Sequence, residues 1–361
     1  MTPGLAAVEL LRVRVPYRRP FRTSFGTTTH RDCVLVRAIG TDGVDGWGEC
    51  TAMEWPGYSS EWTDAAWLVL RDHLVPPTLG GPGREIRGHP MAKAALDVAL
   101  TDLDLRRRGL PLAKHLGGVR DRIPCGVSLG IEERLDDLLA LVNQFVEAGY
   151  RRVKVKIEPG RDVEVVRAVR EAFPATPLSV DANAAYTMEN ARALLDLDDF
   201  GLKYIEQPFP EDDLLGHIEL QRRMATPLCL DETISSARMA RGAIELGACR
   251  IINVKLGRIG GLDEALRIHD VAREAGVPLW VGGMLETGVG RAANVALASL
   301  PGFTLPGDTS ASHRYFEEDL TPSFVVDADG TMAVPDGPGL GVAPLPDRLE
   351  AAVVDRTTVW P

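Results

Sequence analysis

Five charged residues recur at nearly constant spacing through the middle of the chain: Lys156, Asp181, Glu206, Asp231 and Lys255. The steps between them are 25, 25, 25 and 24 residues, and each residue closes a short apolar run rich in β-branched side chains. A period of this length accommodates one strand, one helix and two loops, so each charged residue is predicted at the C-terminal end of a successive parallel strand. That end of a βα-barrel carries the active site.

The region 122–311 is predicted to form the barrel itself. Amphipathic stretches such as 135–149 and 162–173 alternate with short apolar runs, which indicates helices between parallel strands. An open doubly wound sheet is the structural alternative, but it would not place strands on opposite sides of a ring. We therefore expect an α/β fold, a (β/α)7β modified TIM barrel, whose eight strands end near Ser128, Lys156, Asp181, Glu206, Asp231, Lys255, Gly283 and Asp308.

The regions on either side of the barrel are predicted to belong together. Residues 1–121 indicate an α+β domain: β-rich runs at 8–15 and 32–39 flank a polar, basic loop over 17–30, and a helix over 90–108 is stopped by Gly109. The segment 312–361 contains a predicted β-hairpin with an Asp-Gly turn, at 323–337. We expect this tail to return to the first domain and complete it.

Composition excludes several classes of protein. The 361 residues suggest about two domains, and a formal net charge of −11 argues against a nucleic-acid partner. No apolar run approaches the ~18 residues of a membrane span, and the N-terminus lacks the pattern of a signal peptide. The five cysteines form no CxxC pair, so we expect neither a disulfide framework nor a zinc ribbon, and a cytoplasmic location.

The three acids of the repeat point to a metal site. Asp181, Glu206 and Asp231 would converge at one mouth of the barrel, where three adjacent negative charges require a cation. Carboxylate oxygens favour a hard ion, so Mg²⁺ or Mn²⁺ is predicted. The alternative is that each acid caps the helix after its strand. Three acids in phase at the ends of apolar runs favour the metal site.

The two lysines of the repeat suggest acid–base chemistry. Lys156 belongs to the predicted second strand and Lys255 to the sixth, four places apart in a ring of eight. A small-molecule carboxylate held at the metal would present its α-carbon between the two amines, so one can remove a proton and the other return it on the opposite face. A cationic environment would lower the lysine pKa and the metal would stabilise the enediolate. The alternative for each lysine is an ordinary surface charge.

Together these motifs resemble the enolase superfamily, in its muconate-lactonizing subgroup. The resemblance covers nearly the whole chain and includes VKVKIEPG, VDAN, YIEQP, LDET, NVK and GGMLETGVGR followed by GD. It implies that Lys156, the second lysine of KxK, and Lys255 are the bases, and that the metal ligands are Asp181, Glu206 and Asp231. The superfamily's general use of a lysine or histidine base with Mg²⁺ is established.

The resemblance also implies how the chain closes over a substrate. The opening region matches the subgroup's capping domain, with closing loops at roughly Pro16–Thr29 and Glu49–Gly57. A homo-oligomer, a dimer or an octamer, is implied as well.

Within the subgroup, the chain is similar to o-succinylbenzoate synthases that also racemise N-acylamino acids such as N-succinylamino acids. That branch implies substrate contacts from Lys154, Ser128, Asn183, Gly283 and Met284, although Ser128 and Asn183 could serve only loop backbone groups and Met284 only the core. Behind them we expect Arg258, Glu286 and Glu232. Arg258 is hypothesised to depress the pKa of Lys255, or to be structural.

Several reactions remain open at this point. Racemisation of N-acylamino acids, with synthase activity beside it, competes with a dedicated synthase, a dehydration in menaquinone biosynthesis. A muconate-type cycloisomerase is less favoured, as is a dipeptide epimerase, because the DxD pattern of that group is replaced here by Asp308, Thr309 and Ser310. A Schiff-base aldolase needs no carboxylate triad, a binuclear hydrolase would use histidines, and the five-residue constellation argues against a barrel that only binds.

Overall fold

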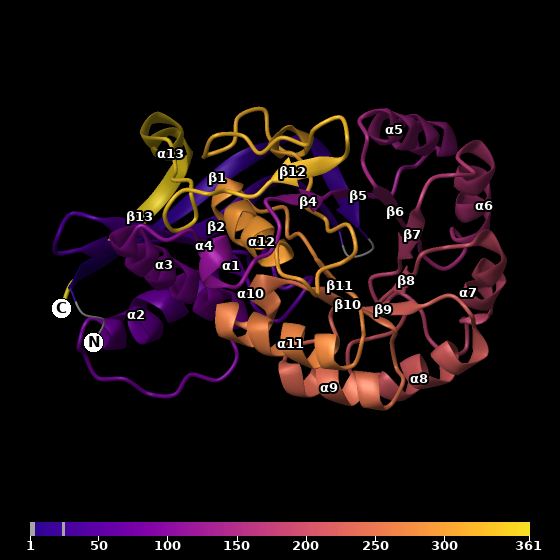
Figure 1. Ribbon diagram of the computed structural model, residues 1–361, viewed down its shortest axis with the longest axis horizontal. Helices are drawn as coiled ribbons and strands as arrows, with labels where there is room; N and C mark the ends of the chain where they lie inside the picture. Colours follow the sequence, from indigo (N-terminus) through magenta and orange to yellow (C-terminus); the bar gives the residue numbers. More distant parts are fainter. Residues whose placement is uncertain (1–3, 24–25) are drawn as a thin grey trace.

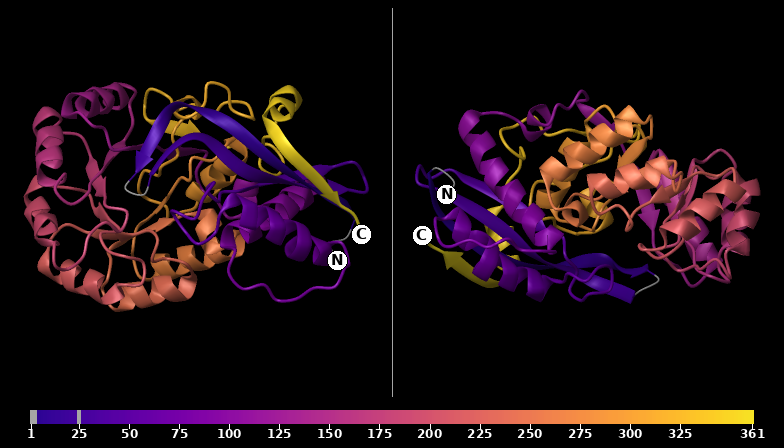
Figure 2. Two further views of the ribbon diagram at one scale, coloured as in Figure 1. Left: turned by 180° about the vertical axis from the view of Figure 1, so that it is seen from behind. Right: turned by 90° about the horizontal axis from the view of Figure 1, so that it is seen from below.

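The computed structural model describes residues 4–23 and 26–361 and contains two domains, each built on its own sheet. Figure 1 shows the antiparallel domain, which holds both chain ends, beside a ring of short strands surrounded by helices. Both views in Figure 2 show the C-terminal strand beside the first strands of the chain. Within the described residues, no helix combines the length and apolar character needed to cross a bilayer.

The first domain is a four-stranded antiparallel sheet in the order β13-β1-β2-β3. Its strands are β1 (Leu5–Thr23), β2 (Gly26–Gly40), β3 (Asp45–Cys50) and β13 (Val353–Val359). Because β13 pairs with β1, with Val8 opposite Val359, the C-terminal tail completes this sheet as predicted.

The polar stretch at 17–30 differs from its prediction as a loop. Its described residues lie in the two long arms of β1 and β2, where Phe21 pairs with Thr28 and Thr23 with Gly26. The register shifts between Pro16 and Phe21, which accommodates the prolines, and the β-branched threonines favour strand. Ser24 and Phe25, within the predicted closing loop, lie outside the described residues.

The long helix of this domain forms where it was predicted. Helix α3 (Pro90–Arg108) begins with a proline and ends at Gly109, whose φ of 62° is the left-handed conformation that glycine adopts readily. It packs closely on β3, because a Cβ on Gly48 would lie 2.0 Å from the carbonyl oxygen of Ala95. Shorter helical segments complete the domain: α1 (Thr63–Val69), the π-helical η1 (Leu70–Leu74), α2 (Val75–Thr78) and α4 (Leu112–His115).

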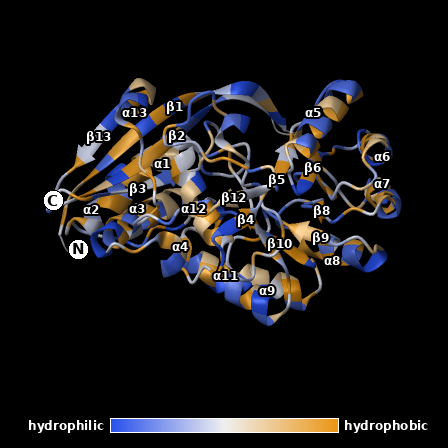
Figure 3. Ribbon diagram, turned by 45° about the horizontal axis from the view of Figure 1, so that its top comes forward, coloured by the Kyte–Doolittle hydropathy of each residue, from blue (hydrophilic) through white to orange (hydrophobic). Residues whose placement is uncertain are grey.

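The barrel has seven parallel strands, in the order β11-β10-β9-β8-β7-β6-β5. They are β5 (Gly126–Leu129), β6 (Arg152–Lys156), β7 (Leu178–Asp181), β8 (Ile205–Glu206), β9 (Leu228–Leu230), β10 (Ile251–Val254) and β11 (Leu279–Val281). The intervening helical segments are α5 (Leu135–Glu147), α6 (Val163–Ala172), α7 (Arg192–Asp196), η2 (Leu197–Phe200), α8 (Leu214–Arg223), α9 (Ala237–Glu245), α10 (Leu256–Ile259), α11 (Leu262–Glu274) and α12 (Gly288–Ala298). Figure 3 shows polar residues on the exposed sides of α5, α8 and α9.

An irregular segment, 303–308, takes the eighth position. It forms isolated parallel bridges from Phe303 to Leu279 and from Gly307 to Cys125, in place of the predicted regular strand. The amide of Gly126 donates to Gly307 (2.7 Å) and the amide of Asp308 donates to Val281 (2.9 Å). The segment therefore bonds to both edge strands of the seven-stranded sheet, which closes the (β/α)7β barrel.

The prediction of a β-hairpin at 323–337 is wrong. Its turn is present, with hydrogen bonds linking Asp327 to Gly330 and Thr331, but β12 (Thr331–Ala333) pairs with β4 (Arg122–Pro124). In the expected first arm, Phe324 instead accepts from the backbone amide of Ser312 (2.9 Å) and donates its own amide to Ser312 Oγ (3.1 Å), in the short helix η3 (Ser312–Arg314). The chain then passes through α13 (Pro346–Ala352) to β13.

Candidate active site

The C-terminal ends of the barrel strands open into a cavity. Both domains line it. The barrel contributes Ser128, Lys154, Lys156, Asp181, Asn183, Lys255, Gly283, Met284, Leu285 and Asp308. The capping domain contributes Phe21, Thr23, Gly26, Thr28, Met53, Trp55 and Tyr58, and the tail adds Tyr315. Both predicted closing segments therefore reach the cavity, and Tyr58 lies one residue beyond the second.

The two predicted bases reach this cavity from separate strands. Lys156 ends β6, the second strand, and its ammonium donates to Asp181 Oδ2 (2.6 Å) and to Asn183 Oδ1. Lys255 directly follows β10, the sixth strand, and donates to Asp231 Oδ2 (2.7 Å). Each lysine therefore rests on a different predicted metal ligand, four strands apart in the ring.

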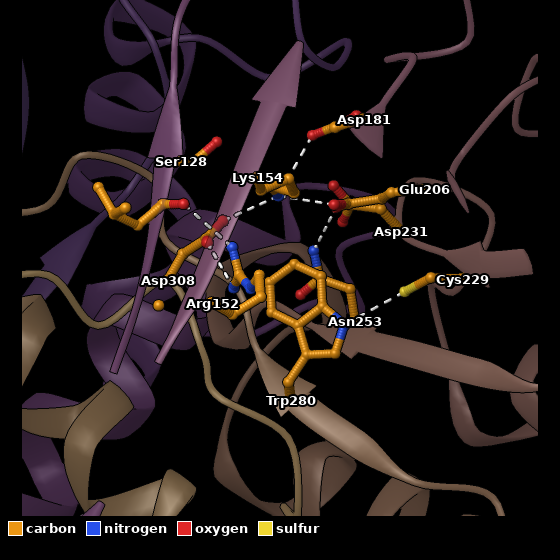
Figure 4. Close-up of polar contacts among 12 residues, drawn as sticks. Ser128, Arg152, Lys154, Asp181, Glu206, Cys229, Asp231, Asn253, Trp280 and Asp308 are labelled. Atoms are coloured by element: carbon orange, nitrogen blue, oxygen red, sulfur yellow. Dashed lines mark hydrogen bonds and ion pairs between the residues drawn. The ribbon is translucent and has the colours of Figure 1, made fainter. Parts of the chain in front are cut away.

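Lys154 lies deeper, inside the barrel (Figure 4). Its ammonium donates to Glu206 Oε2 (2.6 Å) and Asp308 Oδ2 (2.9 Å), and lies 3.3 Å from Asp181 Oδ2. Burial lowers the pKa of Lys154, but the charges of Asp308 and Glu206 outweigh it and raise that pKa well above the ordinary value. Lys154 is therefore a fixed positive charge beneath the cavity.

A buried cationic platform below Lys154 was not predicted. Arg152, also on β6, donates to Asp308 Oδ1 (2.8 Å), and its guanidinium lies 5.1 Å from the ring centre of Trp280. The ammonium of Lys154 lies 4.6 Å from the same ring. The alternation RVKVK at 152–156 could have indicated that all three cations face the barrel interior.

Asn253 is a second residue that the sequence reasoning left out. Its amide donates to Glu206 Oε1 (2.8 Å), so Lys154 and Asn253 hold the two oxygens of this carboxylate. It is the first residue of the NVK motif, and its place two residues before Lys255 on an alternating strand was the available signal.

The buried acids influence one another. Burial raises the pKa of Asp181, but Lys156 and Lys154 outweigh this and hold it below its ordinary range. The pKa of Glu206 is raised by burial and then by the charge of Asp181. That of Glu232 is also raised, chiefly by burial and despite Lys255. The charged forms of Glu206 and Glu232 are therefore disfavoured here, whereas the neighbouring lysines favour that of Asp181.

This donor set fits a hard divalent cation. Asp181, Glu206 and Asp231 supply buried carboxylate oxygens, and Glu232 Oε2 beside them is buried without a hydrogen-bond partner among the described residues. The triad is not drawn together as tightly as an ion would hold it. Within the described residues, the trio whose ligand atoms all lie within 4.8 Å is His30, Asp32 and Glu54. In that trio Asp32 is already bound by Arg12 and Arg14.

Arg258 and Lys255 share one carboxylate. The guanidinium of Arg258 donates to Asp231 Oδ1 and to the backbone carbonyls of Asn253 (2.7 Å) and Ile234 (3.0 Å). Burial lowers the pKa of Lys255, but the phenol of Tyr58 and nearby carboxylates together raise it by more. The pKa of Lys255 therefore lies above the ordinary value. This direction is opposite to the hypothesised depression of that pKa. The negative groups around Lys255 act more strongly than the positive charge of Arg258.

The remaining predicted residues divide into two groups. Ser128, Asn183, Gly283 and Met284 line the cavity, and Asn183 has a positive φ of 42°, a strained conformation typical of functional loops. Glu232 accepts from the amide of Asn183 (3.2 Å).

Glu286 lies behind the cavity wall. It accepts from the Met284 amide (2.6 Å) and Asn294 (2.8 Å), and it pairs with Arg291 (3.0 Å). Glu286 therefore supports the loop that carries Met284.

Comparison with known proteins agrees with this architecture. Residues 6–117 match the model of the mandelate racemase / muconate lactonizing enzyme N-terminal domain, and residues 137–348 match the enolase C-terminal domain-like model. The chain is 53% identical to an N-succinylamino acid racemase of Amycolatopsis sp, over 99% of both chains. It is 48% identical to an o-succinylbenzoate synthase of Geobacillus kaustophilus, over 94% of both.

A solved structure of an enolase-superfamily protein agrees with these matches. An enolase-superfamily protein from Listeria innocua superposes with a TM-score of 0.93 at 38% identity, covering 99% of each chain. Both matched family models and relatives above 30% identity span the two domains described here. The chain is therefore an enzyme of the enolase superfamily, in its muconate-lactonizing subgroup.

Proposed function

We propose that this enzyme racemises N-acylamino acids, N-succinylamino acids among them, by removing and returning the proton next to a carboxylate. The observation that carries the proposal is the placement of Lys156 and Lys255. Both amines reach one cavity from strands four apart in the ring, and each is held by a different carboxylate. Two bases on opposite sides of an α-carbon are what inversion requires.

The proposed proton transfers balance as follows. One lysine starts as the neutral amine and accepts the α-proton, while the electrons of the broken C–H bond move into the substrate carboxylate. The other lysine starts as the ammonium and donates a proton to the opposite face of the carbon. The two lysines thereby exchange protonation states, and exchange with solvent restores them.

The predicted metal ligands give the substrate carboxylate its place. Asp181, Glu206 and Asp231 would hold Mg²⁺ or Mn²⁺, which would stabilise negative charge on the substrate carboxylate. Lys154 adds a fixed positive charge below the same region, because it is buried against Glu206 and Asp308.

An N-acylated substrate fits the cavity better than a free amine. Asp308, the acid at the eighth strand position, is already bound by Arg152 and Lys154, and Ser310 stands where a dipeptide epimerase has a second acid. A substrate ammonium would therefore lack a free carboxylate partner in this place. The cavity wall includes apolar side chains for the rest of the ligand, contributed by Phe21, Met53, Trp55, Met284 and Leu285.

The proposal is tested by incubating the enzyme with Mg²⁺ and each enantiomer of an N-succinylamino acid in D₂O. We expect deuterium at the α-carbon and accumulation of both enantiomers, measured by proton NMR and chiral chromatography. Lys156→Ala and Lys255→Ala should each abolish racemisation while leaving exchange of opposite enantiomers. Loss of exchange for both enantiomers in both variants would contradict the two-base assignment.

Dehydration to o-succinylbenzoate is the second candidate, because a relative at 48% identity is named for it. In that reaction, one of the two lysines would remove the α-proton while the β-hydroxyl leaves with its electron pair. A parallel assay with the synthase substrate separates the cases: dehydration without exchange of N-succinylamino acids indicates a dedicated synthase. Absence of both activities would refute the proposed function.

The oligomer and its location are part of the proposal. We expect a homo-oligomer, a dimer or an octamer, in the cytoplasm. Light scattering after size-exclusion chromatography measures the mass, and a monomer of 39.1 kDa would contradict the first expectation.

A further inference from the structure

Tyr58 brings the capping domain into direct contact with one of the two proposed bases. It lies in the segment that follows β3 and lines the cavity together with Met53 and Trp55. The base of this segment is anchored where Thr63 donates its amide (2.8 Å) and its hydroxyl (3.0 Å) to the carbonyl of Met53. Tyr58 therefore belongs to a segment that the capping domain anchors.

Two kinds of contact join Tyr58 to Lys255. The ammonium of Lys255 donates to the phenol oxygen (3.2 Å) and lies 4.5 Å from the centre of the aromatic ring. The guanidinium of Arg258 donates to the same oxygen (3.2 Å). A cation near an aromatic face and a hydrogen-bonded hydroxyl both restrict where a flexible lysine chain can place its nitrogen.

The other base is held differently. In the part of the chain that the structure describes, the hydrogen bonds of Lys156 go to Asp181 and Asn183, which are both barrel residues. Asp181 ends β7 and Asn183 lies two residues beyond it, so neither belongs to the capping segment. The two faces of the site therefore differ: one base depends on the barrel, and the other is shared between barrel and capping segment.

We infer that Tyr58 is a positioning residue for Lys255, which couples seating of the capping segment to proton transfer on one face of the substrate. The phenol oxygen and ring fix the Lys255 nitrogen beside Asp231, at the cavity wall. When the segment is displaced, Lys255 loses both contacts and samples other rotamers, while Lys156 keeps its position. This inference rests on the proposed two-base function.

The first test compares the two faces within one variant. Lys255→Ala identifies the enantiomer of N-succinylphenylalanine whose α-proton exchange in D₂O needs Lys255. In Tyr58→Phe, which keeps the ring and removes the hydroxyl, exchange of that enantiomer should fall about tenfold, as expected for losing one hydrogen bond to a charged group. Exchange of the other enantiomer should stay within about twofold. Tyr58→Leu, which removes the ring as well, should widen the difference.

Trp55→Phe is the matched control, because it alters the same segment and the same cavity, while the described hydrogen bonds of Lys255 go to Tyr58 and Asp231. It should change exchange of both enantiomers by a similar factor through substrate binding. Equal losses on the two faces in Tyr58→Phe, or no loss on the Lys255 face, would overturn the inference. A purely structural role for Tyr58 predicts those equal losses.

A second measurement does not depend on turnover. Amine labelling followed by mass spectrometry reports the accessibility of each lysine in the folded enzyme. Tyr58→Leu should speed labelling of Lys255 several-fold and leave Lys156 unchanged, and an unchanged Lys255 rate would overturn the inference. If the wild-type enzyme shows no exchange at all, the proposed function fails, while the labelling still decides whether Tyr58 holds Lys255.

Discussion

Replacing Arg152 with methionine should destabilise the barrel where its closure is least regular. Arg152 on β6 reaches the eighth position, donating to Asp308 Oδ1 (2.8 Å) and to the carbonyl of Pro306 (2.9 Å). Because segment 303–308 forms only isolated bridges with its neighbours, this ionic tie replaces part of a strand ladder. The Arg152 and Asp308 side chains are 2% and 8% exposed, so water cannot compensate for its loss.

The expected loss of stability follows from the burial of the Arg152–Asp308 ion pair. Unit charges about 4 Å apart attract by about 4 kcal/mol at an effective dielectric constant of about 20. Removing one partner of a buried pair typically costs about 3–5 kcal/mol, since the other charge stays desolvated. We expect Arg152→Met to lower the free energy of unfolding by that amount in urea titrations followed by circular dichroism. Arg134→Met is the control: its ion pair with Asp136 is 71% and 81% exposed, so about 1 kcal/mol or less is expected.

A double-mutant cycle and a pH series make the test specific. The combined Arg152→Met and Asp308→Asn variant should lose at least 1 kcal/mol less than the sum of the single losses, because the two removals share one interaction; that figure is of the order seen for coupled neighbours. Burial raises the pKa of Asp308, but Lys154 and Arg152 hold it below its ordinary value. The stabilisation is therefore present above the unfolded pKa of about 4 and is lost as the pH falls further. A loss below 1 kcal/mol on the ~3–5 scale, or strictly additive losses, would refute the reasoning.

Three further outcomes are expected. Gly48→Ala should cost about 1–3 kcal/mol in urea unfolding, because its Cβ would meet the Ala95 carbonyl at 2.0 Å, whereas Gly242→Ala, with open space in a helix, should not destabilise. Burial lowers the pKa of His217 despite its bond to the Asp213 carbonyl, so stability should decline as the pH falls below about 6.5, and His217→Phe should flatten that slope in thermal melts. Mg²⁺ should raise the melting temperature of the metal-free enzyme, and Asn or Gln variants of the predicted carboxylate ligands should lose that shift.

The barrel could be predicted because the sequence patterns that indicate it are local. The 25-residue spacing, the amphipathic helices and the ends of β-branched runs depend on residues near one another in the sequence. Helix α3 was equally accessible, since a proline and a glycine mark its two ends. The same reasoning brought Lys156 and Lys255 to one cavity, because parallel strands present their C-terminal ends on one side.

The pairing of β1 with β2 and of β12 with β4 was not accessible in this way. The arms of β1 and β2 read as a polar loop because their strand character depends on pairing with each other, and β12 found its partner more than 200 residues away, in β4. Arg152, Asn253 and Tyr58 were missed for a related reason. A buried arginine or a tyrosine beside a lysine follows from which side chains the closed barrel and the capping segment bring together.

The charge balance at the barrel mouth explains how a lysine could become a base there. The carboxylates are those of Asp181, Glu206, Asp231, Glu232 and Asp308, and the cations facing them are Arg152, Lys154, Lys156, Lys255 and Arg258. With every group charged, the two sets cancel, and the pKa of Lys255 is raised by its acidic surroundings despite burial. The proposed divalent cation and substrate carboxylate would together add one net positive charge. Release of one proton from a lysine would restore neutrality, so the loaded site would favour one amine and one ammonium, the pair that the proposed two-base mechanism needs.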